Sequence, residues 1–189
     1  FIYGGFAQNT ASTLNILNSN LTAGLTINFT REGDTTADAK VYGGIFNNDI
    51  NSNLTISNSN LNNNNINVNA GHSTYWGMSN GQANSDIHGG LINNAGSAQI
   101  SNSDFSSNQI TAHASNTSSS DNATSNAQTQ GRAIYNIRNN LTISNSPFHH
   151  NLLQAIASTD QPNSPATPHG HTLDNPATLH WQGQAPSTK

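Results

Sequence analysis

Short segments in which apolar and polar residues alternate recur four times along this chain. The clearest one reads apolar-x-Ile-x-Asn-Ser-x-apolar and occupies residues 14–21, 54–61, 98–105 and 141–148. Alternation with a period of two places every second side chain on one side of an extended strand. Each copy therefore predicts a β-strand with one face turned inward.

Two further signals flank this segment in every copy. A Gly-Gly-apolar-apolar start precedes it at residues 4–7, 43–46, 89–92 and 131–134, with Arg132 in place of the second Gly in the last copy. A third alternation follows it, at Leu25-x-Ile27, Ile66-x-Val68, Ile110-x-Ala112 and Leu153-x-Ala155. Three short strands per unit are typical of a coil whose successive turns pair in parallel, about 4.8 Å apart. We therefore predict an all-β chain that folds as a right-handed parallel β-helix, with the handedness expected from the chirality of parallel crossovers.

In such a stack, equivalent positions of successive units lie above one another. The predicted inward columns are Leu14, Leu54, Ala98 and Leu141; Ile16, Ile56, Ile100 and Ile143; and Leu21, Leu61, Phe105 and Phe148. The predicted columns at the bends are Asn18, Asn58, Asn102 and Asn145, beside Ser19, Ser59, Ser103 and Ser146. Asn suits a bend because it tolerates left-handed backbone and its amide can bond to the units above and below.

The repeats span residues 1–155, in units that start near residues 4, 43, 89 and 131. Residues 156–189 hold five of the six prolines and none of the repeat signals, so we expect a Pro-rich tail that serves as a linker or a C-terminal cap. Three polar stretches, approximately 28–41, 69–87 and 113–129, fall at the same point of each unit and predict loop insertions on one face of the solenoid. The sequence leaves open whether each period holds one coil with a loop or two coils.

Composition narrows the class of protein. Only 32% of the residues are hydrophobic and 7% are charged, while 33 of 189 are Asn, which suits a solenoid with a narrow core and stacked polar columns. Five Lys and Arg against nine Asp and Glu leave no basic patch for nucleic acid. The absence of Cys excludes disulfides and thiolate metal sites, and no apolar run approaches the roughly 20 residues of a transmembrane segment. Because the chain starts inside a repeat and shows no signal peptide, we expect it to be attached to a longer chain.

The paired tetrapeptides carry a resemblance to a known family. The fourth unit has Gly131-Arg132-Ala133-Ile134 and Phe148-His149-His150-Asn151, which resemble the GGAI and FxxN motifs of polymorphic outer-membrane protein repeats in autotransporter passengers of bacterial surface proteins. The resemblance covers residues 3 to about 155; the first two units have Leu in place of Phe, and the first has Gly24 in place of Asn. It implies a right-handed β-helical passenger, exported to the bacterial cell surface or outer membrane or secreted, that acts in adhesion. It supplies no catalytic residues.

The second polar stretch holds the main candidates for ligand binding, which are His72, Tyr75, Trp76 and Met78. An exposed aromatic pair can stack on a sugar ring or on an apolar patch of a partner. The same two rings could instead fold back and cap the core. The predicted partners are therefore a host or cell-surface protein or a glycan, contacted through loops on one face.

Enzymatic activity is the alternative. Glu32, Asp34 and Asp38 form an acidic cluster between Arg31 and Lys40, and polysaccharide lyases use clustered carboxylates to hold calcium and a basic side chain to move a proton. Carboxylates of that kind would project from stacked strands, whereas these are expected in one loop. Glycoside hydrolases need two facing carboxylates about 5 to 10 Å apart, and no column repeats an acidic residue.

Histidine pairs at 149–150 and at residues 169 and 171 raise a metal hypothesis, but zinc needs three or four converging ligands, so we predict no metal site. We also predict no cofactor and no catalytic residues. The predicted function is a non-enzymatic, surface-exposed adhesin or passenger-type binding or display module, with a polysaccharide lyase or glycoside hydrolase fragment as the alternative.

Overall fold

The structure is a computed structural model that describes residues 1–32, 36–73, 81–117, 124–131, 133–137, 141–159, 166–170 and 179–182. Every regular element within these residues is a β-strand, so the predicted all-β class is confirmed. The described part of the chain has no helix long and apolar enough to cross a membrane.

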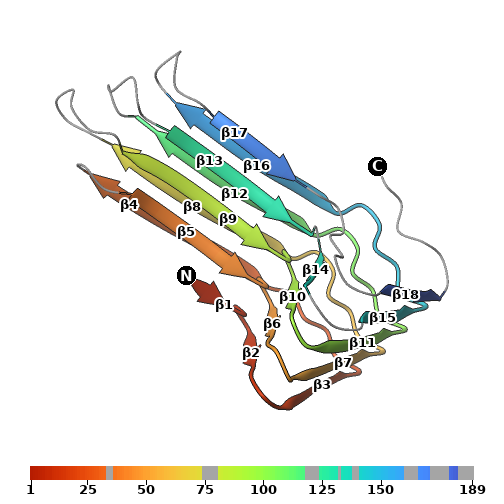
Figure 1. The fold of residues 1–189 in the computed structure, drawn as a ribbon. Coiled ribbons are helices and arrows are strands. Elements are labelled where there is room, and N and C mark those ends of the chain that lie inside the picture. The colour runs from red at the N-terminus through yellow and green to blue at the C-terminus, as the bar shows by residue number, and fades with distance from the viewer. Residues whose placement is uncertain are drawn as a thin grey trace.

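The strands form four sheets in which all neighbouring strands pair in parallel (Figure 1). The first sheet contains, in spatial order, β1 (Ile2–Tyr3), β5 (Thr36–Tyr42), β9 (Gln82–His88), β13 (Thr124–Gln130) and β17 (Ala166–Gly170). The second contains β2 (Ala7–Asn9), β6 (Phe46–Asn48), β10 (Ile92–Asn94) and β14 (Ile134–Asn136). The third contains β3 (Thr13–Leu17), β7 (Asn53–Ser57), β11 (Ser97–Ser101), β15 (Leu141–Ser144) and β18 (Leu179–Gln182). The fourth contains β4 (Gly24–Glu32), β8 (Asn65–Ser73), β12 (Gln109–Asn116) and β16 (Leu152–Thr159).

From β1 to β17 the chain returns to the same sheet after every four strands, so each sequence unit makes one circuit through the four sheets; β18 joins the third sheet three strands after β15. The sequence left open whether each period makes one or two turns of the chain, and the strand order shows one circuit per period. Strands of the first and fourth sheets pack against each other and extend together as two layers, while the shorter strands of the second and third sheets complete the circuit at one end (Figure 1).

The predicted loop insertions are wrong for most of their length. Residues 28–41, 69–87 and 113–129 contribute to the ends of β4, β8 and β12 and to nearly all of β5, β9 and β13. The inward positions of these strands are mostly small, such as Ala37, Ala39, Ser125 and Ala127, all buried. Because these inward residues are Ala and Ser, a search for large apolar residues does not detect the alternation with a period of two in these strands.

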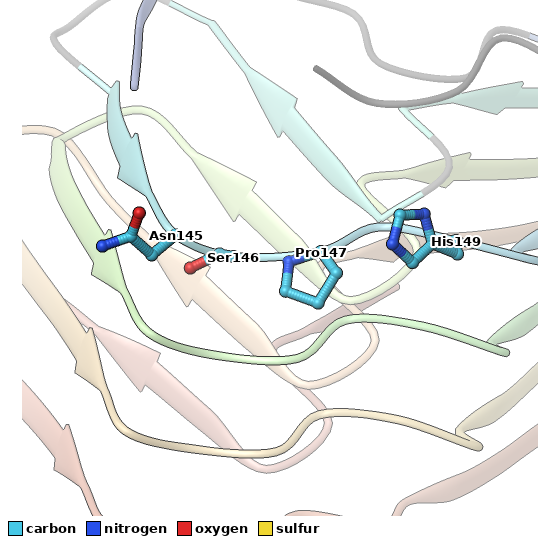
Figure 2. Close-up of a pocket in the computed structure, with 4 residues that line it drawn as sticks. All are labelled: Asn145, Ser146, Pro147 and His149. Carbon is cyan, nitrogen blue, oxygen red and sulfur yellow. The ribbon is translucent and has the colours of Figure 1, made fainter. Parts of the chain in front are cut away.

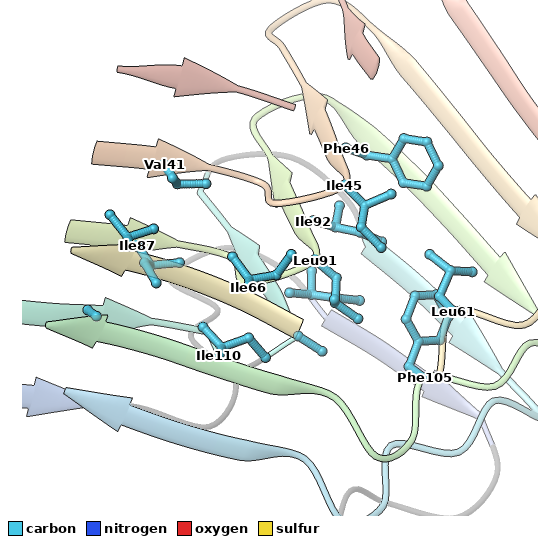
Figure 3. Close-up of a cluster of buried hydrophobic side chains, with 14 of the residues drawn as sticks. Val41, Ile45, Phe46, Leu61, Ile66, Ile87, Leu91, Ile92, Phe105 and Ile110 are labelled. Carbon is cyan, nitrogen blue, oxygen red and sulfur yellow. The ribbon is translucent and has the colours of Figure 1, made fainter. Parts of the chain in front are cut away.

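The predicted inward columns are confirmed by the strand register. Leu54 pairs with Leu14 and Ala98, and Ile56 pairs with Ile16 and Ile100, so like residues stack directly. Leu61 and Phe105 lie at the next corner of the same core (Figure 3). The ring of Phe105 is stacked on that of Phe148 at a centroid distance of 4.8 Å. The side chains of the middle units are fully buried, since a neighbouring unit covers each of them on both sides.

The bends combine left-handed residues with ladders of polar side chains. Asn18, Asn58, Asn102 and Asn145 all have φ between 47° and 51°, as expected for Asn at this place. The serine column forms a ladder, in which the backbone N–H of Ser59 donates to the Oγ of Ser103 at 3.1 Å and that of Ser103 donates to the Oγ of Ser146 at 3.1 Å. Within the predicted Asn column, the Nδ2 of Asn145 donates to Oδ1 of Asn102 at 3.3 Å, whereas the longer amide ladders lie at other positions.

Two buried amide ladders cross the units. Asn9 donates to Asn48 (2.8 Å), Asn48 to Asn94 (2.6 Å) and Asn94 to Asn136 (2.6 Å), each through the side-chain Nδ2 to the next Oδ1. A second ladder joins the Asn residues of the FxxN-like motifs, Asn64, Asn108 and Asn151, at 2.8 and 3.0 Å. Burial explains why Asn recurs at these positions, because a buried amide needs partners and a stacked copy supplies them.

Each unit starts at a glycine with positive φ, at Gly4, Gly43, Gly89 and Gly131, with φ between 60° and 67°. At Gly43 a Cβ atom would overlap the carbonyl oxygen of Phe46, so the corner demands glycine for space as well as for backbone angle.

We expect Gly43→Ala to lower the free energy of unfolding by about 1–3 kcal/mol, because the corner must shift and carry backbone strain. Gly24→Ala is the matched control, since Gly24 has φ outside the left-handed region and no atom within 4 Å of an added Cβ. Chemical denaturation of both variants measures the difference. Equal stability of the two would contradict the proposed role of the corner.

The tail contributes two described strands. β17 pairs with β13, and β18 pairs with β15 through Leu179 opposite Leu141 and Trp181 opposite Ile143. The backbone of β18 therefore lies beside the last core strand of the repeats, as a cap would require.

Candidate ligand-binding face

The predicted ligand-binding residue His72 does not face solvent, which corrects its assignment. It lies near the end of β8, where it continues the inward series Ile66, Val68 and Ala70, and only 2% of it is exposed. Its Nδ1 lies 3.3 Å from Oδ1 of Asn116 on the neighbouring strand. Once the strand extends through the expected loop, the period of two places this side chain between the sheets.

The other three candidates of that group, Tyr75, Trp76 and Met78, lie outside the described residues, and their role stays a prediction. Asp34 of the acidic cluster also lies outside them. Glu32 is exposed at the end of β4, whereas Asp38 lies in the middle of β5 and faces outward from the first sheet. The sequence predicts Glu32 and Asp38 in one loop, but the structure places them on two different strands.

Asp38 belongs to a set of polar side chains that point outward from β5, β9 and β13. We call this set the polar face. It consists of three rows, each containing one residue from each strand in register: Asp38, Asn84 and Asn126 in row 1; Lys40, Asp86 and Gln128 in row 2; Tyr42, His88 and Gln130 in row 3. The residues between them, such as Ala39 and Ser85, are buried, so the alternation is strict. The face extends about 13 Å along β5 and about 10 Å across the three strands.

Row 1 is tied together by hydrogen bonds between strands. The Nδ2 of Asn84 donates to Oδ1 of Asp38 at 2.7 Å, and the Nδ2 of Asn126 donates to Oδ1 of Asn84 at 2.9 Å. These bonds fix the side-chain rotamers, and a row that is already ordered loses less conformational entropy when it binds a ligand.

Row 2 contains the ion pair Lys40–Asp86, with the Nζ of Lys40 3.0 Å from Oδ2 of Asp86. The hydrogen bond to Asp86 raises the pKa of Lys40 above its ordinary value, against the opposing effect of partial burial. Lys40 is therefore held as an ammonium group. Such a group binds and orients, but it cannot accept a proton from a substrate.

Row 3 continues into an aromatic stack. The rings of Tyr3 and Tyr42 lie 4.9 Å apart at 7°, those of Tyr42 and His88 lie 4.8 Å apart at 15°, and Tyr135 meets His88 edge-on at 5.4 Å. Tyr3 is 47% exposed, so the stack presents ring surface next to the charged and amide rows. Rings beside polar rows are a common composition of binding surfaces.

Two hollows open on the described surface, and one of them borders the polar face. One of about 250 Å³ lies at the bend after β15 and is lined by Asn145, Ser146, Pro147 and His149 (Figure 2). Its Ser146 hydroxyl donates to the carbonyl of Ser144 and belongs to the serine ladder, so the hollow is built from bend structure. The other, of about 360 Å³, lies between the edges of β4 and β5, where Asp38 and Lys40 form part of its rim. Within the described residues, no group of three His, Cys, Asp or Glu side chains is placed to hold a metal ion.

Sequence reasoning identified Asp38 but missed its neighbours on the face. Asn84, Asp86 and Asn126 were assigned to loops, so their register with Asp38 and Lys40 was not visible. The available signal was the run from Thr36 to Tyr42, Thr-Ala-Asp-Ala-Lys-Val-Tyr, in which Ala, Ala and Val alternate with polar residues.

Comparison with known proteins adds no relative to these observations. No protein-family model, curated protein or solved structure matches this chain.

Proposed function

We propose that the chain is a non-enzymatic binding or display module of a bacterial surface or secreted protein, in which a right-handed parallel β-helix carries the polar face towards a host protein or glycan. From β1 to β17 the chain returns to the same parallel sheet after every four strands, which supports the β-helix. The GGAI-like and FxxN-like motifs support a passenger of the outer-membrane or autotransporter type that is attached to a longer chain.

The observation that carries the proposal is the polar face itself. Its three rows present amide, charged and aromatic groups on a regular parallel sheet, and row 1 is held in place by the bonds among Asp38, Asn84 and Asn126. A solenoid is a rigid spacer, so a preordered face on its side meets a partner without large rearrangement.

The ends of β4, β8 and β12 lie side by side because these strands are in register. Tyr75, Trp76 and Met78 follow β8 in the sequence, outside the described residues, and stay candidates for a second contact with the same partner.

A panel of immobilised extracellular-matrix proteins and glycans, probed with the labelled chain, tests this function. We expect binding that the double variant Asp38→Ala/Asn84→Ala weakens at least about tenfold, since two hydrogen-bonding groups of row 1 are removed. The control is Asn28→Ala/Asn69→Ala, which removes a similar exposed pair, bonded at 2.8 Å, from the outer side of the fourth sheet. Equal binding by both double variants would refute a role of the polar face.

A polysaccharide lyase or glycoside hydrolase is the second candidate. Its specific support is that Asp38 and Asp86 project from adjacent strands, which is the arrangement such enzymes use and which the loop assignment had argued against. The raised pKa of Lys40 argues against a lysine base at this place. Incubation with uronate and neutral polysaccharides separates the two functions: release of products that Asp38→Ala abolishes would replace the binding module with an enzyme.

A further inference from the structure

The polar face matches a repeating ligand in one direction only. Across the strands, each row offers a new side chain about every 4.8 Å, the spacing of neighbouring strands. Along a strand the chemistry changes at every second residue, from Asp38 to Lys40 to Tyr42 on β5. Only row 1 keeps similar chemistry across the strands, since Asp38, Asn84 and Asn126 all present side-chain oxygens. A linear ligand made of similar units therefore meets similar partners in successive positions only if it lies across the strands along row 1.

Row 1 suits hydroxyl groups. An Asn amide carries two hydrogens to donate and two lone pairs to accept, and a sugar hydroxyl both donates and accepts. The bonds within the row use one hydrogen and one lone pair of Asn84. The carboxylate of Asp38 adds a strong acceptor at one end of the row, so the row can receive several hydroxyl groups in sequence.

Charge selects against acidic ligands. The described charged side chains of the face are two carboxylates, Asp38 and Asp86, and one ammonium, Lys40. Lys40 is already paired with Asp86 at 3.0 Å, so the net charge of the face is negative and its excess lies at Asp38 in row 1. A chain of uronates would bring like charges together, which opposes binding.

Resting on the binding function proposed above, we infer that the ligand of the polar face is a neutral linear glycan that lies across β5, β9 and β13. Its ring hydroxyls contact row 1 and the ion pair of row 2. Neither a free acidic polysaccharide nor a globular protein fits the combination of repeating amides and excess negative charge as well.

Titration calorimetry with neutral β-1,4-linked glucose and mannose oligomers, from monosaccharide to hexamer, tests the inference, with oligogalacturonate as the acidic counterpart. The affinity for the neutral oligomers should rise up to about three sugar units, since the three strands of the polar face span about 10 Å, and then change little. Asn84→Ala should weaken binding about tenfold, whereas Asn69→Ala on the fourth sheet should leave it unchanged. Asp38→Asn, which keeps an acceptor and removes the charge, should raise the affinity for oligogalacturonate.

The outcomes separate the inference from the function on which it rests. Tighter binding of oligogalacturonate than of neutral oligomers by the unmodified chain overturns the inference. So does a protein partner that depends on Asp38 and Asn84 but is not displaced by any neutral oligomer, although the binding module itself then stands. If no arrayed protein or glycan binding depends on these residues, the function falls and the inference with it.

Discussion

Asn48→Leu should lower the free energy of unfolding by about 3–5 kcal/mol, a large part of the total stability of an ordinary domain. Asn48 is fully buried in the middle of an amide ladder; it accepts from Asn9 and donates to Asn94 Oδ1 at 2.6 Å and to the carbonyl oxygen of Ser97 at 3.0 Å. Leucine has a similar volume but no polar group, so it leaves these two acceptors buried without that donor. Its bulk also prevents a water molecule from replacing the amide.

The control for this variant is Asn60→Leu. Asn60 also joins two units through a side-chain amide bond, to Asn20 at 2.8 Å, but both residues are exposed. Water can replace that bond, so we expect a change of at most about 0.5 kcal/mol. Urea denaturation followed by circular dichroism compares the two variants, and a loss under about 1 kcal/mol for Asn48→Leu would show that the buried ladder contributes little.

Phe105→Ala should cost about 3–5 kcal/mol of unfolding free energy. The side chain is fully buried, and its ring lies on that of Phe148 at an interplanar angle of 6°, so truncation removes a large apolar surface and leaves a cavity in the corner of the core. The neighbouring backbone is hydrogen-bonded to the units on both sides, which limits how far the cavity can collapse.

Phe6→Ala is the matched substitution for comparison, because the ring of Phe6 is 62% exposed. It should cost less than about 1 kcal/mol. Thermal unfolding monitored by calorimetry ranks the two variants. If Phe6→Ala proves as harmful as Phe105→Ala, then the column at the corner is not the centre of the core.

The strand register followed from the sequence wherever large side chains mark it. Ile56 and Leu54 belong to a triplet in which apolar positions two residues apart are filled by Leu or Ile in nearly every copy, and no other arrangement of a repeated strand buries all copies equally well. The bend residues could also be predicted, since Asn58 and Ser59 recur at equivalent positions of every unit. Asn58 tolerates the positive φ of the bend, and Ser59 bonds to Ser103 of the next unit.

The two layers formed by the first and fourth sheets could not be predicted from the sequence in the same way. Ala83, Ser85 and Ser125 are buried there, yet Ala and Ser also occur in loops, so the sequence does not distinguish a closely packed strand from a polar insertion. His72 illustrates the consequence, because a histidine in a supposed loop was assigned to the surface, whereas the strand places it inside.

The sequence by itself determined the repeat, the inward columns and the bend residues, because these depend on spacing within one unit and on stacking of like residues. Only the tertiary structure decided that the polar stretches form strands of two facing layers, that Asn48 and its equivalents form a buried ladder, and that Asp38, Lys40, Asn84 and Asp86 share one face. The physical reason is that these features depend on which strand lies beside another, across unequal distances in sequence of 39 to 46 residues. Pairing between units sets that neighbourhood, and no local pattern of apolar and polar residues encodes it.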